Sequence, residues 1–137
     1  MHKNRLFNNK GFTLSELLIV MAIILVLVAV GMGVFGDSLE RARETSDIAT
    51  LRGVYASALS KMMTENVDTV SIKVGSDTKS YRFQQRDKDS WKINASNLDL
   101  PWEGTLPSID NKSDGIVTFT LGTSEGESVV IMTYTDR

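Results

Sequence analysis

The hydrophobic pattern divides the chain into one apolar stretch and a remainder of mixed polarity. No charged residue occurs between Leu17 and Gly36. As a helix, this stretch would rise about 30 Å, which matches the hydrocarbon core of a bilayer. The pattern therefore predicts a membrane-spanning segment near the start of the chain. A buried helix of a soluble protein is the weaker alternative, because such helices rarely stay apolar for so long.

After Asp37, apolar residues recur at intervals of three or four, which places them on one helical face. The residues with this spacing are Ile48, Leu51, Tyr55, Leu59 and Met62. No proline precedes Pro101. The simplest prediction is one continuous helix from about Phe12 into the mid-sixties. Its second half is apolar on one side only, so we expect a sheet to cover that side.

The second half of the sequence predicts that sheet. Segments 69–74, 81–83 and 91–93 alternate between apolar and polar residues. Segments 116–121 and 129–135 are rich in β-branched residues, and a glycine-containing turn separates them. These patterns predict four or five antiparallel strands joined by hairpins. With the long helix they give an α+β fold, in which the second half of the helix packs on a small antiparallel sheet.

A long segment between Ser96 and Gly115 contains both prolines and interrupts the strand pattern. A loop of this length in a small domain is either functional or contains a missed element. Trp102 lies in this loop, where it would stack on a sugar or a partner surface, or pin the loop to the sheet. Trp91 lies in an alternating segment, so we expect it to pack in the core.

Charge and cysteine content narrow the function classes. The leader contains Lys3, Arg5 and Lys10 and no acid, so the positive-inside rule places it in the cytoplasm and the carboxyl end outside. The whole chain has 15 basic and 17 acidic side chains, and the excess acid lies after the leader, which argues against a nucleic-acid-binding protein. The absence of cysteine excludes disulfides and thiolate sites.

An ordinary secretory signal cut near residues 29–31 is disfavoured, because the apolar segment continues past that point.

Glu16 lies at the entrance of the apolar stretch. An unpaired carboxylate in hydrocarbon is very costly, so this side chain needs a partner or a function. The alternative is an interfacial acid that reaches toward water and has no specific role.

The run Lys10 to Leu18, KGFTLSELL, resembles the type IV pilin and pseudopilin superfamily. The resemblance implies that a prepilin peptidase cuts between Gly11 and Phe12 and then methylates the new amine of Phe12. It also implies that Glu16, fifth in the mature chain, serves filament assembly. In a bundle of helices, the Glu16 carboxylate would meet the Phe12 amine of a neighbouring copy and set the axial register.

The predicted organisation follows from this resemblance. Residues 1–11 are the leader peptide, residues 12–36 the transmembrane and assembly half of the helix, and residues 37–137 the globular head. The predicted function is a structural subunit of a type IV pilus or related filament. The alternatives are a pseudopilin of a type II secretion or competence DNA-uptake system, and a single-pass membrane-anchored extracellular binding protein with its leader intact.

The resemblance also implies the partners and the location. The partners are further copies of the chain, minor pilins, a prepilin peptidase, and an assembly platform protein with its ATPase. The chain is expected in the cytoplasmic membrane before assembly and in an extracellular or cell-surface filament afterwards. No direct nucleic-acid binding is predicted.

The apolar run departs from the common family pattern, which has a proline near its end. Here Gly31, Gly33 and Gly36 occupy that region. These glycines would let the helix bend or stretch, or would allow close packing between membrane helices, and both interpretations stay open. Together with the missing cysteines, this departure leaves the branch of the superfamily open, with a weak preference for a Gram-positive pilin or a pseudopilin.

The remaining motifs predict no catalytic, cofactor or metal site. The segment 110–115 resembles a calcium loop, but Lys112 and Leu121 occupy places where oxygen ligands are needed, so a polar turn is the better interpretation. His2 is the only histidine and lies in the leader. The acids between Leu39 and Glu65 are expected to form a solvated helix face or subunit contacts. The sequence therefore predicts that the protein is not an enzyme.

Overall fold

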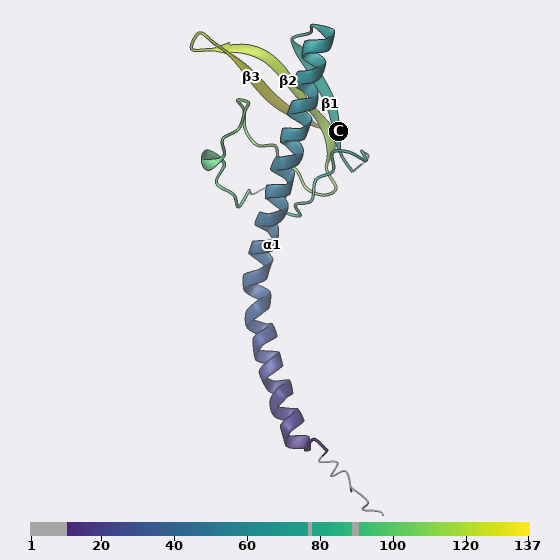
Figure 1. The fold of residues 1–137 in the computed structure, drawn as a ribbon, viewed down its shortest axis with the longest axis vertical. Helices are drawn as coiled ribbons and strands as arrows, with labels where there is room; N and C mark the ends of the chain where they lie inside the picture. Colours follow the sequence, from purple (N-terminus) through teal and green to yellow (C-terminus); the bar gives the residue numbers. More distant parts are fainter. Residues whose placement is uncertain (1–10, 77, 89–90) are drawn as a thin grey trace, which may run out of the picture. The chain divides into compact units, whose positions relative to one another are not determined.

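The computed structural model describes residues 11–76, 78–88 and 91–137 (Figure 1). The elements are α1 (Leu14–Glu65), β1 (Thr69–Gly75), the short 3-10 helix η1 (Ala95–Asn97), β2 (Asp114–Ser124) and β3 (Glu127–Asp136). The chain divides into two compact units, residues 1–36 and residues 37–137, and α1 contributes to both. The predicted α+β class, with one long helix and a small antiparallel sheet, is confirmed.

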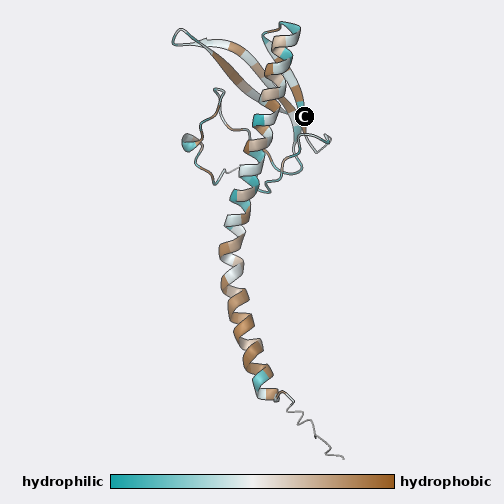
Figure 2. Cartoon of the chain, in the orientation of Figure 1, coloured by the Kyte–Doolittle hydropathy of each residue, from teal (hydrophilic) through white to brown (hydrophobic). Residues whose placement is uncertain are grey.

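The first unit contains the apolar half of α1. Figure 2 shows this half as almost uniformly hydrophobic, whereas hydrophobic and hydrophilic residues alternate in the second half. A window of 18 residues in α1 reaches a mean hydropathy of 3.1. Among the described residues, this is the one helix whose length and composition suit a membrane span.

The second unit, which we call the head, is built on a three-stranded sheet in the order β1-β2-β3. Both strand pairs are antiparallel, and the register places Val70 opposite Phe119 and Phe119 opposite Met132. β2 and β3 are joined by a two-residue turn. Its residues Glu125 and Gly126 have φ angles of 50° and 88°. Two positive φ angles match the twist of the flanking strands, which is why a glycine stands there.

The core of the head lies between the second half of α1 and the sheet. Leu51, Val54 and Ala58 of the helix are fully buried against Val117 and Phe119 of β2. A fully buried leucine contributes roughly 2 kcal/mol to folding. Tyr55 and Leu59, which were expected on the buried face, are only half-buried.

Trp102 is buried and belongs to a cluster of three aromatic rings. The centroid of its ring lies 5.6 Å from that of Tyr55 and 5.9 Å from that of Phe119. The neighbouring Glu103 forms an isolated bridge with β3 at Ile131. Trp102 thus pins its loop to the helix and the sheet, as one of the two interpretations predicted. Trp91 is half-buried, packs against the core and donates its ring N–H to the carbonyl of Pro107 at 2.9 Å.

Segments 81–83 and 91–93 are not strands, so the prediction of four or five strands was wrong, and the described part of the chain has three. The backbone N–H groups in and just beyond these segments donate to α1 instead of to a neighbouring strand. Three carboxylates on α1, which we call the acid clamp, each accept two successive backbone N–H groups. Asp47 binds Gln84 and Gln85, Glu40 binds Arg86 and Asp87, and Glu44 binds Lys92 and Ile93.

The acid clamp also corrects the prediction for the acids of the helix. Glu40, Glu44 and Asp47 are exposed by only 6%, 1% and 0%. Their spacings of four and three residues place them on one face of α1, where they face the irregular segment rather than solvent. Buried carboxylates are tolerated here because each is hydrogen-bonded by the backbone.

Candidate functional site

The residues that carry the predicted processing site precede α1. Gly11, Phe12 and Thr13 lie outside any helix or strand, and all three are exposed. The side chain of Phe12 is 82% exposed. A peptidase needs its substrate in an open backbone conformation, and exposed chain outside regular structure provides one. Among the described residues, no helix or strand contains the bond between Gly11 and Phe12, which suits cleavage by a peptidase.

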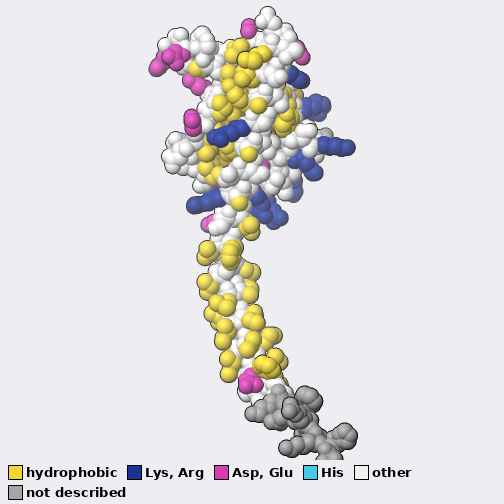
Figure 3. All heavy atoms as spheres, viewed as in Figure 1, with side chains coloured by type: hydrophobic (Ala, Val, Ile, Leu, Met, Phe, Trp, Pro, Cys, Tyr) yellow, Lys and Arg dark blue, Asp and Glu magenta, His cyan; other side chains and the backbone are white. Residues whose placement is uncertain are grey.

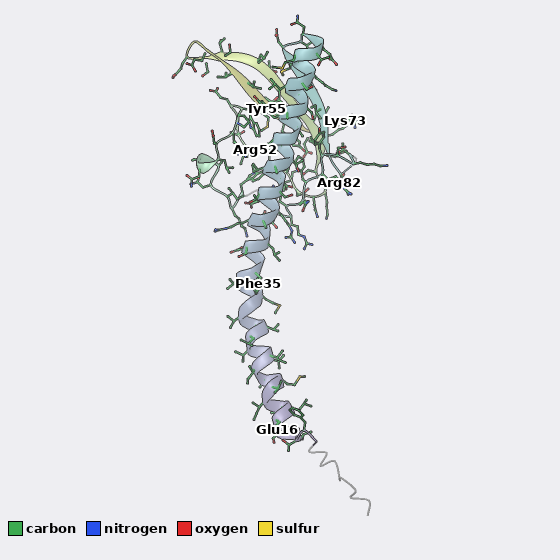
Figure 4. The ribbon with its side chains drawn as sticks, viewed as in Figure 1. Glu16, Phe35, Arg52, Tyr55, Lys73 and Arg82 are labelled. Carbon is green, nitrogen blue, oxygen red and sulfur yellow. The ribbon has the colours of Figure 1, made fainter. Side chains whose placement is uncertain are left out.

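Glu16 lies in the first turn of α1 (Figure 4). It forms hydrogen bonds with Thr13 in both directions. The backbone N–H of Thr13 donates to Oε2 of Glu16 at 2.9 Å. The backbone N–H of Glu16 donates to the hydroxyl oxygen of Thr13 at 3.3 Å. This reciprocal pattern is a capping box, which satisfies N–H groups that the first turn of a helix leaves without partners.

The capping box is a role of Glu16 that the sequence interpretation missed. The signal was present in Thr13-Leu14-Ser15-Glu16, where threonine precedes glutamate by three residues just before an apolar run. The negative charge of Glu16 is also favourable near the amino end of a helix. Glu16 thus has a partner in its own chain, but this partner is a neutral amide.

The carboxylate of Glu16 retains unused acceptor capacity. An ionised carboxylate has about four lone-pair positions on two oxygens, and the capping box uses one position on Oε2. The structure therefore brings Gly11, Phe12 and Glu16 together at the start of the helix, with acceptor positions of Glu16 still available for a cation.

The apolar surface that follows Glu16 is exposed along its length. The large apolar side chains from Leu17 to Phe35 are between 46% and 70% exposed. Figure 3 shows hydrophobic side chains covering this part of the helix on the visible face. A continuous apolar surface of this extent requires lipid or other protein around it.

No contact among the described residues requires the three glycines of this segment. A Cβ atom added at Gly33 or Gly36 would meet no atom within 4 Å, and one at Gly31 would meet only the ring of Phe35 at an ordinary 3.5 Å. No positive φ angle requires glycine at these positions. Both interpretations of the glycines, flexibility and close packing of helices, therefore stay open.

The segment 110–115 forms a polar turn. Oδ1 of Asp110 accepts hydrogen bonds from the backbone N–H of Lys112 and the hydroxyl of Ser113, each at 2.9 Å. Burial raises the pKa of Asp110, but these hydrogen bonds outweigh it and lower the pKa below its usual value. Among the described residues there is no group of three acidic or histidine side chains that would hold a metal ion.

The comparisons with known proteins agree with this site. No curated protein and no solved structure gives a significant match to the chain. One family matches, described as the prokaryotic N-terminal methylation motif, over residues 6–32. This range covers the residues around Gly11, the capping box and most of the apolar stretch. The motif is characteristic of the type IV pilin and pseudopilin signal, and the chain therefore carries the amino-terminal signature of a type IV pilin-like or pseudopilin precursor.

Proposed function

We propose that this chain is a prepilin whose mature form is a structural subunit of a type IV pilus or related filament. The observation that carries the proposal is the methylation motif at residues 6–32, placed directly before and along an uninterrupted apolar helix. In this proposal, residues 1–11 are a leader, residues 12–36 anchor and assemble the subunit, and residues 37–137 form the head.

Maturation is proposed to begin with cleavage between Gly11 and Phe12 by a prepilin peptidase, followed by methylation of the Phe12 amine. The exposure of this bond outside α1 supports the proposal. The cut leaves Thr13 and Glu16 in the mature chain, so the capping box persists after processing.

Assembly is proposed to transfer the apolar half of α1 from lipid into a bundle of identical helices. Lipid tails and apolar side chains are similar surroundings for such a helix, so the transfer is governed by packing and by polar contacts. The subunit would lie in the cytoplasmic membrane before assembly and in a cell-surface filament afterwards. An assembly platform with its ATPase and minor pilins would be the further partners.

Glu16 is proposed to bind the Phe12 ammonium of a neighbouring copy. The acceptor positions that the capping box leaves open would accept this cation while Thr13 stays bonded. A copy shifted along the axis would bury an unmatched acid, which is strongly unfavourable, so the pair would also define the register.

Mass spectrometry of the chain from its own cells tests the proposal. We expect a mature protein that begins at an N-methylated Phe12, and sheared filaments that contain it. An intact leader would overturn the proposal in favour of a membrane-anchored binding protein. Methylated protein without sheared filaments would instead indicate a pseudopilin.

The variant Gly11→Val tests the proposed cleavage site directly. A Cβ atom added at Gly11 would meet no atom of the described residues within 4 Å, and position 11 lies outside α1, so we expect the fold of the head to be kept. We expect it to block cleavage, because a valine occupies the position that the peptidase must accept. Normal processing of this variant would contradict the predicted cleavage site.

A further inference from the structure

Two ends of the sheet in the head have opposite charge. At one end, Arg43, Arg82 and Arg86 surround a surface pocket of about 390 Å³, which we call the arginine pocket. At the other end, Glu125 and Glu127 flank Gly126 in the turn between β2 and β3, which we call the acidic tip. In Figure 3, acidic side chains gather at the hairpin, and lysine and arginine side chains gather on the opposite side of the head.

The arginine pocket contains unmatched positive charge. Arg43 pairs with Oε2 of Glu40 at 2.9 Å, and Oε1 of Glu40 accepts the backbone N–H groups of Arg86 and Asp87. Arg82 and Arg86 are exposed, and neither makes an ion pair in the part of the chain that the structure describes. Two guanidinium groups therefore remain available for an acidic partner.

The acidic tip contains the matching negative charge. Glu125 and Glu127 are both exposed, and neither has a basic partner within the described residues. The two-residue turn holds them on a narrow projection, because the paired strands β2 and β3 continue to Ser124 and Glu127. Two carboxylates are thus exposed at the end of the paired strands.

The pocket and the tip are too far apart to meet within one molecule. Gly75 pairs with Asp114 at one end of the sheet, and the backbone N–H of Gly75 donates to the carbonyl of Tyr81, next to Arg82 (Figure 4). β2 runs from Asp114 to Ser124, which corresponds to roughly 33 Å along the strand. The tip lies at its far end, so a contact between these charges must join two molecules.

We propose that the acidic tip of one copy docks into the arginine pocket of the next copy. The proposal rests on the proposed function as a filament subunit, and it adds a specific contact between heads. The occupant is a second copy because the chain presents both surfaces, with complementary charge, at opposite ends of the same sheet. Such a contact is heterologous: it joins unlike surfaces and repeats along an open chain of molecules, as a filament requires. Arginine suits this pocket because its planar group binds carboxylates with two parallel hydrogen bonds.

Charge exchange in the full chain tests the contact. We expect the variants Glu125→Lys with Glu127→Lys, and Arg82→Glu with Arg86→Glu, each to reduce filament yield by at least about tenfold, because like charges then face each other. The combination of all four substitutions should restore the yield to within about twofold of wild type. Loss in both pairs without restoration would overturn the proposal and would point to a different anionic ligand of the pocket.

A matched control is provided by Asp99→Lys with Glu103→Lys. These acids are also exposed, but they lie in the loop that holds Trp102 and not in the acidic tip. The control changes net charge as much as the tip variant does, and we expect filament yield to change by less than about twofold. An equal loss in the control would contradict a site-specific contact.

Disulfide trapping gives a second measurement that does not depend on filament yield. The chain has no cysteine, so Ser124→Cys and Gln84→Cys introduce a single thiol beside the tip and a single thiol in the pocket. The double variant should give a ladder of cross-linked dimers, trimers and longer species under oxidation, whereas each single variant should give no cross-linked species. Cross-linked dimers of a single variant, or no ladder in the double variant, would overturn the proposed contact.

The two proposals fail in different ways. Methylation at Phe12 and normal filaments, together with unaffected charge variants and no ladder, would remove this contact and leave the proposed function intact. An intact leader would remove the proposed function first. In that case a ladder that forms between membrane-anchored copies would still support the contact between heads.

Discussion

The two halves of α1 use acidic side chains in different ways. In the head half, Glu40, Glu44 and Asp47 are buried and each binds two backbone N–H groups of the same chain. In the apolar half, Glu16 is exposed, binds one N–H group and keeps acceptor positions available. The head half of the helix therefore uses carboxylates to fix its own fold, and we propose that the apolar half uses one to recognise a neighbour. The predictions below test this division.

The largest effect is expected for the proposed charge pair of Glu16. Glu16→Gln keeps an oxygen for the capping box but removes the charge, and we expect incorporation beside wild-type subunits to fall by at least about tenfold. Processing should continue, because the cleaved bond is unchanged. Filaments separated by shearing and analysed by mass spectrometry give the ratio of variant to wild-type chain. Equal incorporation would refute the pairing role and leave Glu16 as a helix cap only.

The next effect concerns the acid clamp. Glu44→Ala leaves the N–H groups of Lys92 and Ile93 without their acceptors, and we expect the free energy of unfolding to fall by about 3 kcal/mol. Near-ultraviolet circular dichroism of the full chain in detergent reports on the head, because both tryptophans lie there. Glu65→Ala, which removes an exposed acid of the same helix, serves as the control, with an expected change below about 0.5 kcal/mol. Equal losses in the two variants would show that the clamp has no special stabilising role.

The pH dependence of stability distinguishes Asp47 from Glu40, because the pKa values of the two carboxyl groups are shifted in opposite directions. Burial raises the pKa of Asp47, so its contribution is present at low pH and is lost as pH rises through the raised pKa. For Glu40, burial is outweighed by hydrogen bonds from Arg86, Arg43 and Asp87, and the pKa is lowered. Its contribution is present above the ordinary value of 4.5 and is lost as pH falls through the lowered pKa. Stability of the head should therefore rise slightly from neutral into mildly acidic solution and then fall.

Two variants test which carboxylate causes the rise in stability toward mild acid and which causes the fall at lower pH. Asp47→Asn should remove the rise toward mild acid, and Glu40→Gln should flatten the fall at lower pH. Thermal unfolding of the full chain at pH values between neutral and about 3 measures both arms. A profile that is unchanged by either substitution would show that these carboxylates do not control the pH dependence.

The smallest effect is expected for the cap itself. Thr13→Ala removes one side of the capping box while Glu16 keeps its charge, and we expect a loss of about 1 kcal/mol in the stability of the first helical turn. Amide hydrogen exchange of the residues following Thr13 measures this change. Incorporation into filaments should stay close to wild type, in contrast to Glu16→Gln. A loss of incorporation as large as that of Glu16→Gln would mean that the cap, and not the charge, is what assembly requires.

The sequence predicted α1 and the β2–β3 hairpin well because their patterns are long. The apolar stretch from Leu17 to Gly36 and the β-branched segments around the turn at Gly126 each extend over many residues, so local propensity and burial agree. The segments 81–83 and 91–93 are only three residues long, and alternation over three residues does not distinguish a strand from an extended loop.

The acid clamp could not be predicted from the sequence pattern. Acids spaced by four and three residues on a helix have the same pattern whether they face water or a folded loop. What distinguishes them is a partner more than 35 residues away, namely the backbone N–H groups of residues 84–87 and 92–93. The motif and the capping box of the candidate site are both local sequence patterns, so they can be recognised without knowledge of distant contacts. The sequence interpretation missed the role of Glu16 as a cap, whereas cleavage after Gly11, methylation of Phe12 and the pairing of Glu16 stay predictions.

The acid clamp also bears on the conditions in which the head can fold. Its bonds join side-chain oxygens to main-chain amides, so the irregular part of the head is fastened without sulfur chemistry. Because the chain has no cysteine, folding of the head depends on no disulfide bond. The same hydrogen bonds can therefore form under oxidising and under reducing conditions.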